Sequence, residues 1–556
     1  MPELIKNQII TARMEGYTAE GHGVCRAEGR AIFVPGTMEG ELWEVRIVRV
    51  TSSAVWGRGE TLLEVSSDRI VPDCGVFPRC GGCSLRHMRY EAELAMKLRR
   101  VNDALRRIGK LDFSINEILP AEENGFQRRK VIFNVGEQNG RPVAGFYRAR
   151  SHDIVPADAC PAVSPEAMDA AKTVLEWMED RGIPAWDEPD RRDGVRHIFY
   201  RSSRLTGKCV LTLIVSKEPG RADMDALRDM LRLRCPSLSG LVLNRNTARG
   251  NTVLAGEFRT VWGEAELKEG LCGLTFSLSP RSFFQVNPPQ AEKLYEKALE
   301  YAAIRPDTTA LDLYCGTGTI GLCMASRGAR VIGAEIVAPA VENAKANARE
   351  NGLEDRCEFI CADASQAAKE LQRRNIRPEV IVVDPPRKGL APDVIDAAVG
   401  MAPDRIVYVS CDPGTLARDL AIFAEKGYAP VTGAAVDMFP RTSHVETCVL
   451  LSHKKPDGHI HVKVEFGEGE GKVPIDDIAK RAEAYKRKER VTYKMIQDYI
   501  EEKYGFKVHT AYIAEVKRSL GLPMYDAPNA VEELKQPRKH PTVEKTKAIE
   551  ETLKYF

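Results

Sequence analysis

Cys411 and Glu446 are the residues whose types and positions most clearly indicate covalent chemistry. Cys411 follows the apolar run 405–410, a predicted strand, and precedes Asp-Pro-Gly, so it is presented where a strand passes into a loop. A thiol in such a place can act as a nucleophile, and a carboxylate such as Glu446 can move a proton for it. The alternative, a small buried hydrophobic residue, suits Cys323, Cys357 and Cys361 better.

A second group of thiols indicates a metal centre. Cys74, Cys80 and Cys83 have the spacing C-x5-C-x2-C in a loop that also holds two glycines, and Cys160 is the next cysteine along the chain. Such crowding favours a thiolate-bound metal over three reduced buried thiols, with Cys160 as the fourth ligand. Spacing alone does not distinguish zinc from an iron–sulfur cluster. It differs from the C-x3-C-x2-C of radical enzymes, which argues against that chemistry.

A glycine loop indicates a nucleoside cofactor. A predicted strand runs through Asp312 into Gly316-Thr-Gly318, and the next strand ends at Glu335. In a doubly wound sheet, such glycines let the backbone approach a ligand, and the acidic residue binds ribose hydroxyls. Asp363 follows a third strand and is expected to accept a hydrogen bond from an adenine amine. Because a third-glycine dinucleotide signature and a P-loop are both missing, S-adenosylmethionine fits better than NAD or ATP.

A methyltransferase needs a nucleophilic thiol when its target carbon is inert. Carbon 5 of uracil reacts only after a thiolate adds to carbon 6 and creates an enolate, which attacks the activated methyl group. Glu446 is the carboxylate that we expect to remove the carbon 5 proton, while His444 is expected to support the site or the core. Asp384, in Asp-Pro-Pro-Arg, is placed to orient a base. This loop resembles that of amino-group methyltransferases, but Arg387 replaces their aromatic residue.

Strands and helices alternate regularly from about residue 305, which predicts a doubly wound α/β domain. Its parallel strands present their carboxyl ends at one edge, where these residues would meet. Short strands separated by glycines precede it and predict a small β-barrel, and basic residues mix with aromatic ones in 126–133 and 146–152, as suits RNA binding. We therefore expect four parts: 1–70, a β-barrel; 71–300, a central α+β RNA-binding region with the cysteines; 301–452, a Rossmann-like domain; and 453–556, a helical extension.

The extension has its own pattern. Glycine-rich and charged stretches at 454–458 and 467–471 predict a linker, and apolar residues at three- and four-residue spacing predict helices over 475–485, 492–504 and 510–518. The turn between the last two is similar to that of a helix-turn-helix, and the basic run 486–490 makes nucleic acid a candidate partner. A protein-interaction or stabilising module is the alternative.

Composition excludes several classes of protein. Among 556 residues, 80 Lys and Arg stand against 79 Asp and Glu, so the chain is not a bulk nucleic-acid coater and RNA contacts must be local. No apolar run approaches the roughly 18 to 20 residues of a membrane span, and the N-terminus lacks a signal-peptide layout. We expect a cytoplasmic monomer with no membrane contact. Fourteen cysteines are too sparse for a disulfide scaffold.

The motifs together resemble those of the bacterial RNA (uracil-5)-methyltransferase family. They are Ser-Phe-Phe-Gln-Val-Asn at 282–287, Asp-Leu-Tyr-Cys-Gly-Thr-Gly at 312–318, Asp-Pro-Pro-Arg at 384–387, Ser-Cys-Asp-Pro at 410–413 and His-Val-Glu-Thr at 444–447. The resemblance covers residues 4 to about 452 and is greatest to the 23S ribosomal RNA branch. That branch carries an N-terminal TRAM domain, which 21–24 and 35–41 resemble, and a four-cysteine [4Fe-4S] cluster.

The resemblance implies a set of roles. It implies that Cys411 is the nucleophile, that Glu446 accepts the proton, and that the cluster is structural. The implied cofactor contacts are Gln285, Tyr314, Glu335 and Asp384; the implied cluster ligands are Cys74, Cys80, Cys83 and Cys160. Some family members have an Asn that contacts the cofactor at the position of Thr319. The threonine hydroxyl reaches less far than that Asn side chain would. The resemblance implies that the target is a uridine of ribosomal RNA, flipped out of its fold. One alternative is a uridine of tRNA. The other is an RNA chaperone for which methylation is secondary.

Overall fold

A computed structural model describes residues 4–122, 126–187, 192–250, 252–453, 493–520 and 541–555. The chain divides into two compact units, Met1–Asp457 and Gly458–Phe556. The larger unit contains three sheets with separate cores and one short hairpin. Among the described residues, no helix combines the length and apolarity that crossing a bilayer requires.

The N-terminal β-domain is a six-stranded sheet in the order β1-β5-β6-β4-β3-β2. Alternating residues of its strands point inward, and Cys25, Ile32, Val45 and Ile47 are fully buried among them. Its strands are β1 (Ile9–Arg13), β2 (Gly16–Tyr17), β3 (Gly23–Ala27), β4 (Arg30–Val34), β5 (Leu42–Val50) and β6 (Val55–Glu64). The glycine-separated strands predicted for a small β-barrel lie in this sheet, and the barrel itself stays a prediction.

The central sheet has seven strands in the order β10-β9-β8-β11-β12-β13-β14, and helices α2 and α3 pack on it around one core. Ser164 caps α2 by accepting a hydrogen bond from Ala167 N at 3.3 Å. The strands are β8 (Lys130–Gln138), β9 (Arg141–Tyr147), β10 (Ile154–Pro156), β11 (Val195–Ser202), β12 (Cys209–Val215), β13 (Leu238–Arg245) and β14 (Glu257–Gly263). The helices are α2 (Pro165–Arg181) and α3 (Arg221–Arg234), and a hairpin of β15 (Leu267–Leu271) and β16 (Leu274–Leu278) follows.

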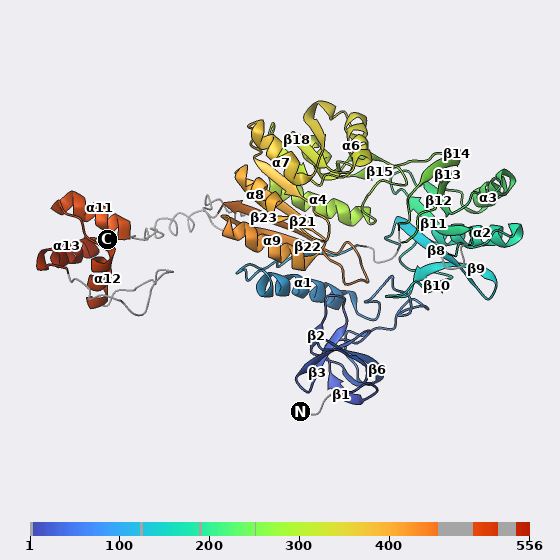
Figure 1. Cartoon of the computed structure of the whole chain (residues 1–556), viewed down its shortest axis with the longest axis horizontal. Coiled ribbons are helices and arrows are strands. Elements are labelled where there is room, and N and C mark those ends of the chain that lie inside the picture. The colour runs from blue at the N-terminus through green and yellow to red at the C-terminus, as the bar shows by residue number, and fades with distance from the viewer. Residues whose placement is uncertain are drawn as a thin grey trace, which may run out of the picture. The chain divides into compact units, whose positions relative to one another are not determined.

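The third sheet has eight strands in the order β19-β18-β17-β20-β21-β23-β22-β7. Strands β17 to β21 are parallel and almost wholly apolar, and β23 is antiparallel to β21, so both faces are covered and two apolar cores result. The strands are β17 (Thr309–Leu313), β18 (Arg330–Glu335), β19 (Cys357–Cys361), β20 (Val380–Val383), β21 (Arg405–Ser410), β22 (Tyr428–Val436) and β23 (Glu446–His453). The helices are α4 (Pro288–Ala302), α5 (Thr319–Ser326), α6 (Ala338–Glu350), α7 (Ala364–Arg373), α8 (Pro392–Gly400) and α9 (Pro413–Glu425), with a 3-10 turn η1 (Glu354–Arg356). The predicted Rossmann-like α/β fold is confirmed (Figure 1).

Two elements from the early part of the chain join this third sheet. Helix α1 (Tyr90–Arg107) packs against α9, with Val101 and Leu105 in the same core as the sheet. Strand β7 (Ile118–Leu119) pairs in parallel with β22 and forms the edge of the sheet. In Figure 1, α1 runs between the N-terminal β-domain and the eight-stranded sheet. The expected division between 71–300 and 301–452 stays a prediction.

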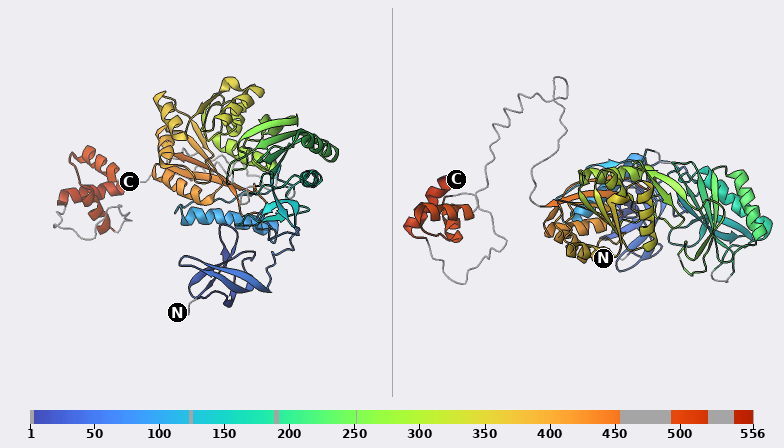
Figure 2. Two further views of the ribbon diagram at one scale, coloured as in Figure 1. Left: turned by 45° about the vertical axis from the view of Figure 1, so that its right-hand side comes forward. Right: turned by 90° about the horizontal axis from the view of Figure 1, so that it is seen from above.

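The C-terminal unit contains three described helices, which share a small core that includes Ile496, Ile500, Ile513 and Ile549. They are α11 (Tyr493–Tyr504), α12 (Thr510–Ser519) and α13 (Val543–Tyr555), drawn in red in Figure 2. The first two lie where helices were predicted, whereas α13 was not predicted. The expected linker, the expected helix at 475–485 and the basic run 486–490 lie outside the described residues.

Candidate active site

The predicted catalytic pair meets where β21 ends and β23 begins. Ser410, the last residue of β21, is registered with Thr447 of the antiparallel β23, so the next positions, Cys411 and Glu446, lie beside each other. The Thr447 hydroxyl donates to Ser410 O at 3.2 Å. Asp412 caps α9 by accepting from Thr415 N at 2.9 Å, which fixes the residue after the thiol. The thiol is therefore held between a strand end and a capped helix.

The glycine loop is shaped for close approach of a ligand. Tyr314, Gly316 and Gly318 all have positive φ, which turns the chain sharply after β17. Glu335 accepts hydrogen bonds from Gly316 N at 3.1 Å and Val337 N at 2.9 Å, so its carboxylate is fixed beside the loop. Tyr314 N donates to Ala334 O at 3.0 Å, so the predicted Tyr314 and Glu335 both lie at the carboxyl edge of the sheet.

The other predicted cofactor residues have varied surroundings. The Thr319 hydroxyl lies 3.2 Å from Tyr295 OH. Asp363 caps α7 by accepting from Ser365 N at 2.9 Å, which is a structural role. Gln285 is half-buried in the segment before α4, and its neighbour Val286 accepts a backbone hydrogen bond from Arg129.

Three carboxyl groups crowd the same edge and hold protons strongly. Burial, and after it the nearby Asp384 carboxylate, raise the pKa of Asp312 to about 8 and that of Glu446 to about 8. Burial raises the pKa of Asp384 to about 7. The guanidinium of Arg387 opposes the shift at Glu446. A positively charged ligand placed among these groups would favour their ionised forms.

The thiol shares this environment. Burial, then the carboxylates of Glu446 and Asp384, raise the pKa of Cys411 to about 11, and Arg387 opposes the rise. Burial, then Arg387 and other cations, lower the pKa of His444 to about 4, so its imidazole is neutral at pH 7. A neutral imidazole agrees with the supporting role expected for His444.

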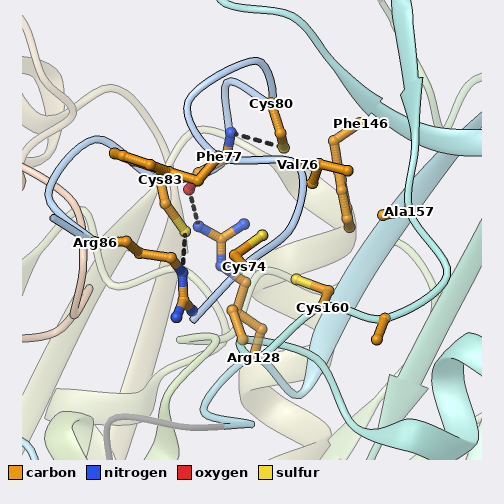
Figure 3. A pocket seen from close by; sticks show the side chains of 13 residues that line it. Cys74, Val76, Phe77, Cys80, Cys83, Arg86, Arg128, Phe146, Ala157 and Cys160 are labelled. Carbon is orange, nitrogen blue, oxygen red and sulfur yellow. Dashed lines mark hydrogen bonds between the residues drawn. The ribbon is translucent and has the colours of Figure 1, made fainter. Parts of the chain in front are cut away.

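The four cysteines of the predicted metal centre line one cavity. Figure 3 shows Cys74, Cys80 and Cys83 on one loop around it and Cys160 on a second, distant segment. Gly82 N donates to the sulfur of Cys80 at 3.3 Å, and Arg86 Nε donates to that of Cys83 at 3.3 Å. In the described part of the chain, no group of three or more His, Cys, Asp or Glu side chains forms a site for a single metal ion.

Sequence reasoning misjudged Cys361 and missed a groove. Cys323 is buried as expected, but Cys361 is exposed, because it lies at the end of the edge strand β19.

A groove of about 810 Å³ lies between the N-terminal β-domain, α1 and the start of α9, and it reaches Asp412 beside the thiol. Its cationic and aromatic lining comprises Tyr17, Arg26, Phe33, Arg99, Arg100, Arg106 and Arg107. The signal was the run of arginines on α1, which by itself resembles a solvated helix face.

Comparisons with known proteins agree on one class of enzyme. The sequence model of the family described as tRNA (Uracil-5-)-methyltransferase matches residues 170–454. An uncharacterized RNA methyltransferase of Clostridium tetani is 38% identical over 448 residues, which are 81% of this chain and 97% of that protein. One of Oceanobacillus iheyensis is 39% identical over 455 residues, 82% and 98% of the two chains.

One solved structure is similar over most of its length. The Pyrococcus abyssi tRNA (uracil-54, C5)-methyltransferase, in complex with S-adenosyl-L-homocysteine, has a TM-score of 0.66 and 25% identity. The match covers 79% of this chain and 99% of that one.

Proposed function

Because the chain belongs to the tRNA (Uracil-5-)-methyltransferase family and methylates carbon 5 of uracil in RNA with S-adenosylmethionine, we propose that its substrate is 23S ribosomal RNA and that Cys411 and Glu446 carry the reaction. The register that puts these two residues side by side is the observation that carries the mechanism. The six-stranded N-terminal sheet and the four-cysteine cavity support the 23S branch.

In the proposed mechanism, the Cys411 thiolate forms a bond to carbon 6 of uracil, and the electron pair of the 5,6 double bond moves into an enolate. Carbon 5 then attacks the sulfonium-bound methyl group, and S-adenosylhomocysteine leaves. Glu446 takes the carbon 5 proton, the C–H electron pair re-forms the double bond, and the bond between carbon 6 and sulfur breaks to release the thiolate.

The resting protonation states decide what the surrounding residues must do. With pKa values near 11 and 8, the thiol of Cys411 and the carboxyl of Glu446 are both protonated at pH 7 in the free site. Each must ionise before it acts. Arg387 favours the ionised form of both, because its positive charge faces both groups.

A cradle for the methyl donor is proposed at the carboxyl edge of the sheet. At Gly316 a Cβ would meet no atom within 4 Å, so the glycine loop faces open space there. The fixed Glu335 carboxylate suits ribose hydroxyls, and the Asp384 carboxyl suits a cation or a base. The residues proposed to hold the donor are Gln285, Tyr314, Thr319, Glu335, Asp363 and Asp384.

The cysteine cavity is proposed to hold a [4Fe-4S] cluster through Cys74, Cys80, Cys83 and Cys160. Four thiolates of such a cluster bind four different iron atoms, so they need not converge on a single ion. The guanidinium groups of Arg86 and Arg128 lie on the cavity wall and would offset part of the negative charge. The cluster would supply a structural link between the cysteine loop and the central sheet.

RNA is proposed to lie in the groove between the N-terminal β-domain and α1. Its arginines suit phosphates, and Tyr17 and Phe33 offer faces on which bases can stack. Asp412, the residue after Cys411, lines this groove, and from there a uridine flipped out of the bound RNA is proposed to enter the site. The N-terminal β-domain would then act as the TRAM-like part of the enzyme.

A second candidate substrate is tRNA, which the similarity to the Pyrococcus abyssi enzyme favours. The test is release of tritium from carbon 5 of labelled uridine, measured on unmodified 23S ribosomal RNA and on unmodified tRNA with S-adenosylmethionine present. Wild type and the control Cys361→Ala, which alters an exposed cysteine, should release tritium from ribosomal RNA, and Cys411→Ala should not. Release from tRNA alone would replace the substrate proposal, and release by Cys411→Ala would refute the mechanism.

A further inference from the structure

Residues 437–443 form most of the connection between β22 and β23 and lead directly to His444. This stretch, the 437–443 segment, lies outside both strands and is held by contacts of its own residues. It leads to Glu446, whose backbone is paired with Val436 of β22, so its contacts act on Glu446 together with the strand pairing. Many of those contacts come from one face of α1. They involve Tyr90, Glu93, Lys97 and Arg100, whose three- and four-residue spacing places them on one side of the helix. We call these four residues the α1 stripe.

The centre of the stripe is a buried ion-pair network with Asp437. Lys97 Nζ donates to Asp437 Oδ1 at 2.5 Å, to Glu93 Oε1 at 2.7 Å and to Phe439 O at 3.2 Å. Tyr90 OH donates to Asp437 Oδ2 at 2.6 Å. The side chains of Glu93, Lys97 and Asp437 have no solvent exposure.

The second half of the segment is held in the same way. Glu93 Oε1 accepts from Arg441 N at 2.7 Å, and the Arg441 guanidinium lies 3.6 Å from Glu93. Arg100 donates to Ser443 O at 2.5 Å, and Ser84, just after Cys83, accepts from Ser443 N at 3.1 Å. The residue next to His444 is therefore anchored from α1 and from the cysteine loop at once.

Polar side chains at the start of α4 also hold the segment. Asn287 donates to Met438 O at 3.1 Å, and Gln290 donates to Asp437 O at 3.0 Å. In the buried network, the carboxylates of Glu93 and Asp437 are balanced by the cations Lys97 and Arg441. Burying so many charges is costly and contributes little net stability, whereas removing one partner leaves another charge unpaired. Such a network suits a role in fixing geometry.

We infer that the α1 stripe is a positioning device for the last step of the reaction, holding the 437–443 segment so that the Glu446 carboxylate meets the carbon 5 proton. The inference rests on the proposed function, because it assumes that Glu446 takes this proton. Cys411 lies between β21 and α9 rather than in this segment. Within the stripe, Arg100 reaches toward the thiol, since it lies 3.9 Å from Asp412, whereas Tyr90 and Lys97 bind Asp437. Addition of the thiol and methyl transfer should therefore depend on Tyr90 and Lys97 far less than elimination does. Disturbing the stripe at these two residues should slow elimination selectively.

The test uses Tyr90→Phe and Lys97→Met in the full chain. Tyr90→Phe removes one hydroxyl and leaves the charges paired. The inference can therefore still be tested with this variant if Lys97→Met fails to fold. Glu91→Gln is the matched control, because Glu91 is exposed on the same turn of α1. The assay measures two species with methyl-labelled S-adenosylmethionine and ribosomal RNA: the methylated covalent protein–RNA adduct, and free methylated RNA.

Misplacing a catalytic group by about 1 Å can cost about 100-fold in rate, so both variants should release product about 10- to 100-fold more slowly. The adduct should accumulate at the same time, as it should for Glu446→Gln, while Glu91→Gln behaves as wild type. Product and adduct falling together, or neither changing in a folded variant, would overturn the inference. Absence of methylation and adduct in wild type would instead overturn the proposed function and this inference with it.

Discussion

Binding of S-adenosylmethionine should strengthen as the pH rises from 6 to 8. Asp312, Asp384 and Glu446 share the carboxyl edge of the sheet and have pKa values of about 8, 7 and 8, so the free site holds protons near neutral pH. The sulfonium of the methyl donor favours ionised carboxylates. Binding should therefore release a proton, and the release becomes easier at higher pH.

The size of the effect follows from the pKa values. If one group with a pKa near 8 must ionise, it is about 99% protonated at pH 6 and about half protonated at pH 8, which changes the affinity about 50-fold. The three groups interact, so the change belongs to the site rather than to one residue. Glu335 raises the pKa of Asp312, and Arg387 lowers that of Glu446. Both residues are present with and without ligand, so they do not change the comparison.

The assay is isothermal titration calorimetry at several pH values, in buffers of different ionisation enthalpy so that proton release is measured directly. S-adenosylhomocysteine is the control ligand, because it has the same nucleoside and amino acid but no sulfonium charge. Its affinity should change less with pH, and Glu446→Gln should flatten the curve for S-adenosylmethionine. Equal pH dependence for the two ligands, or a flat curve for both, would refute the reasoning.

Three further changes test other parts of the structure. Gly333→Ala places a Cβ 2.6 Å from Phe359, so it should lower the free energy of unfolding by about 1–3 kcal/mol in urea titrations; an unchanged midpoint would contradict the close packing. Cys160→Ser should lower the iron content and visible absorbance of the purified protein while Cys361→Ser does not, and equal iron in both would argue against the proposed ligand set. Arg387→Met should raise the pKa of the Cys411 thiol, which would shift its alkylation by iodoacetamide, followed by mass spectrometry, to higher pH; an unmoved profile would show that this guanidinium does not act on the thiol.

The fold class and the edge that carries the site were predictable because they depend on local patterns. Apolar runs followed by Gly316, Asp384 and Cys411 marked strand ends, and parallel strands must bring such ends to one edge. Helices α11 and α12 were equally visible in their apolar spacing. Strand β7 was not predictable, since two residues carry no period.

The surroundings of the site were less predictable because they depend on distant partners. In sequence, Glu93 and Lys97 look like an ordinary exposed pair one helical turn apart. In the structure they are fully buried, because Asp437, 340 residues after Lys97, completes their network. The raised pKa of Glu446 likewise depends on burial and on Asp384, which only the folded sheet brings near.

The pairing of β7 with β22 has a consequence for synthesis of the chain. Ala435 is registered with Ile118, 317 residues earlier, so the edge strand leaves the ribosome long before its partner exists. At about 5–20 residues per second, the wait is roughly 15 to 60 s. The central sheet, whose strands end at Gly263, has time to fold during this interval, while α1 and β7 must stay available. One of the first segments to be translated is thus among the last to find its final place.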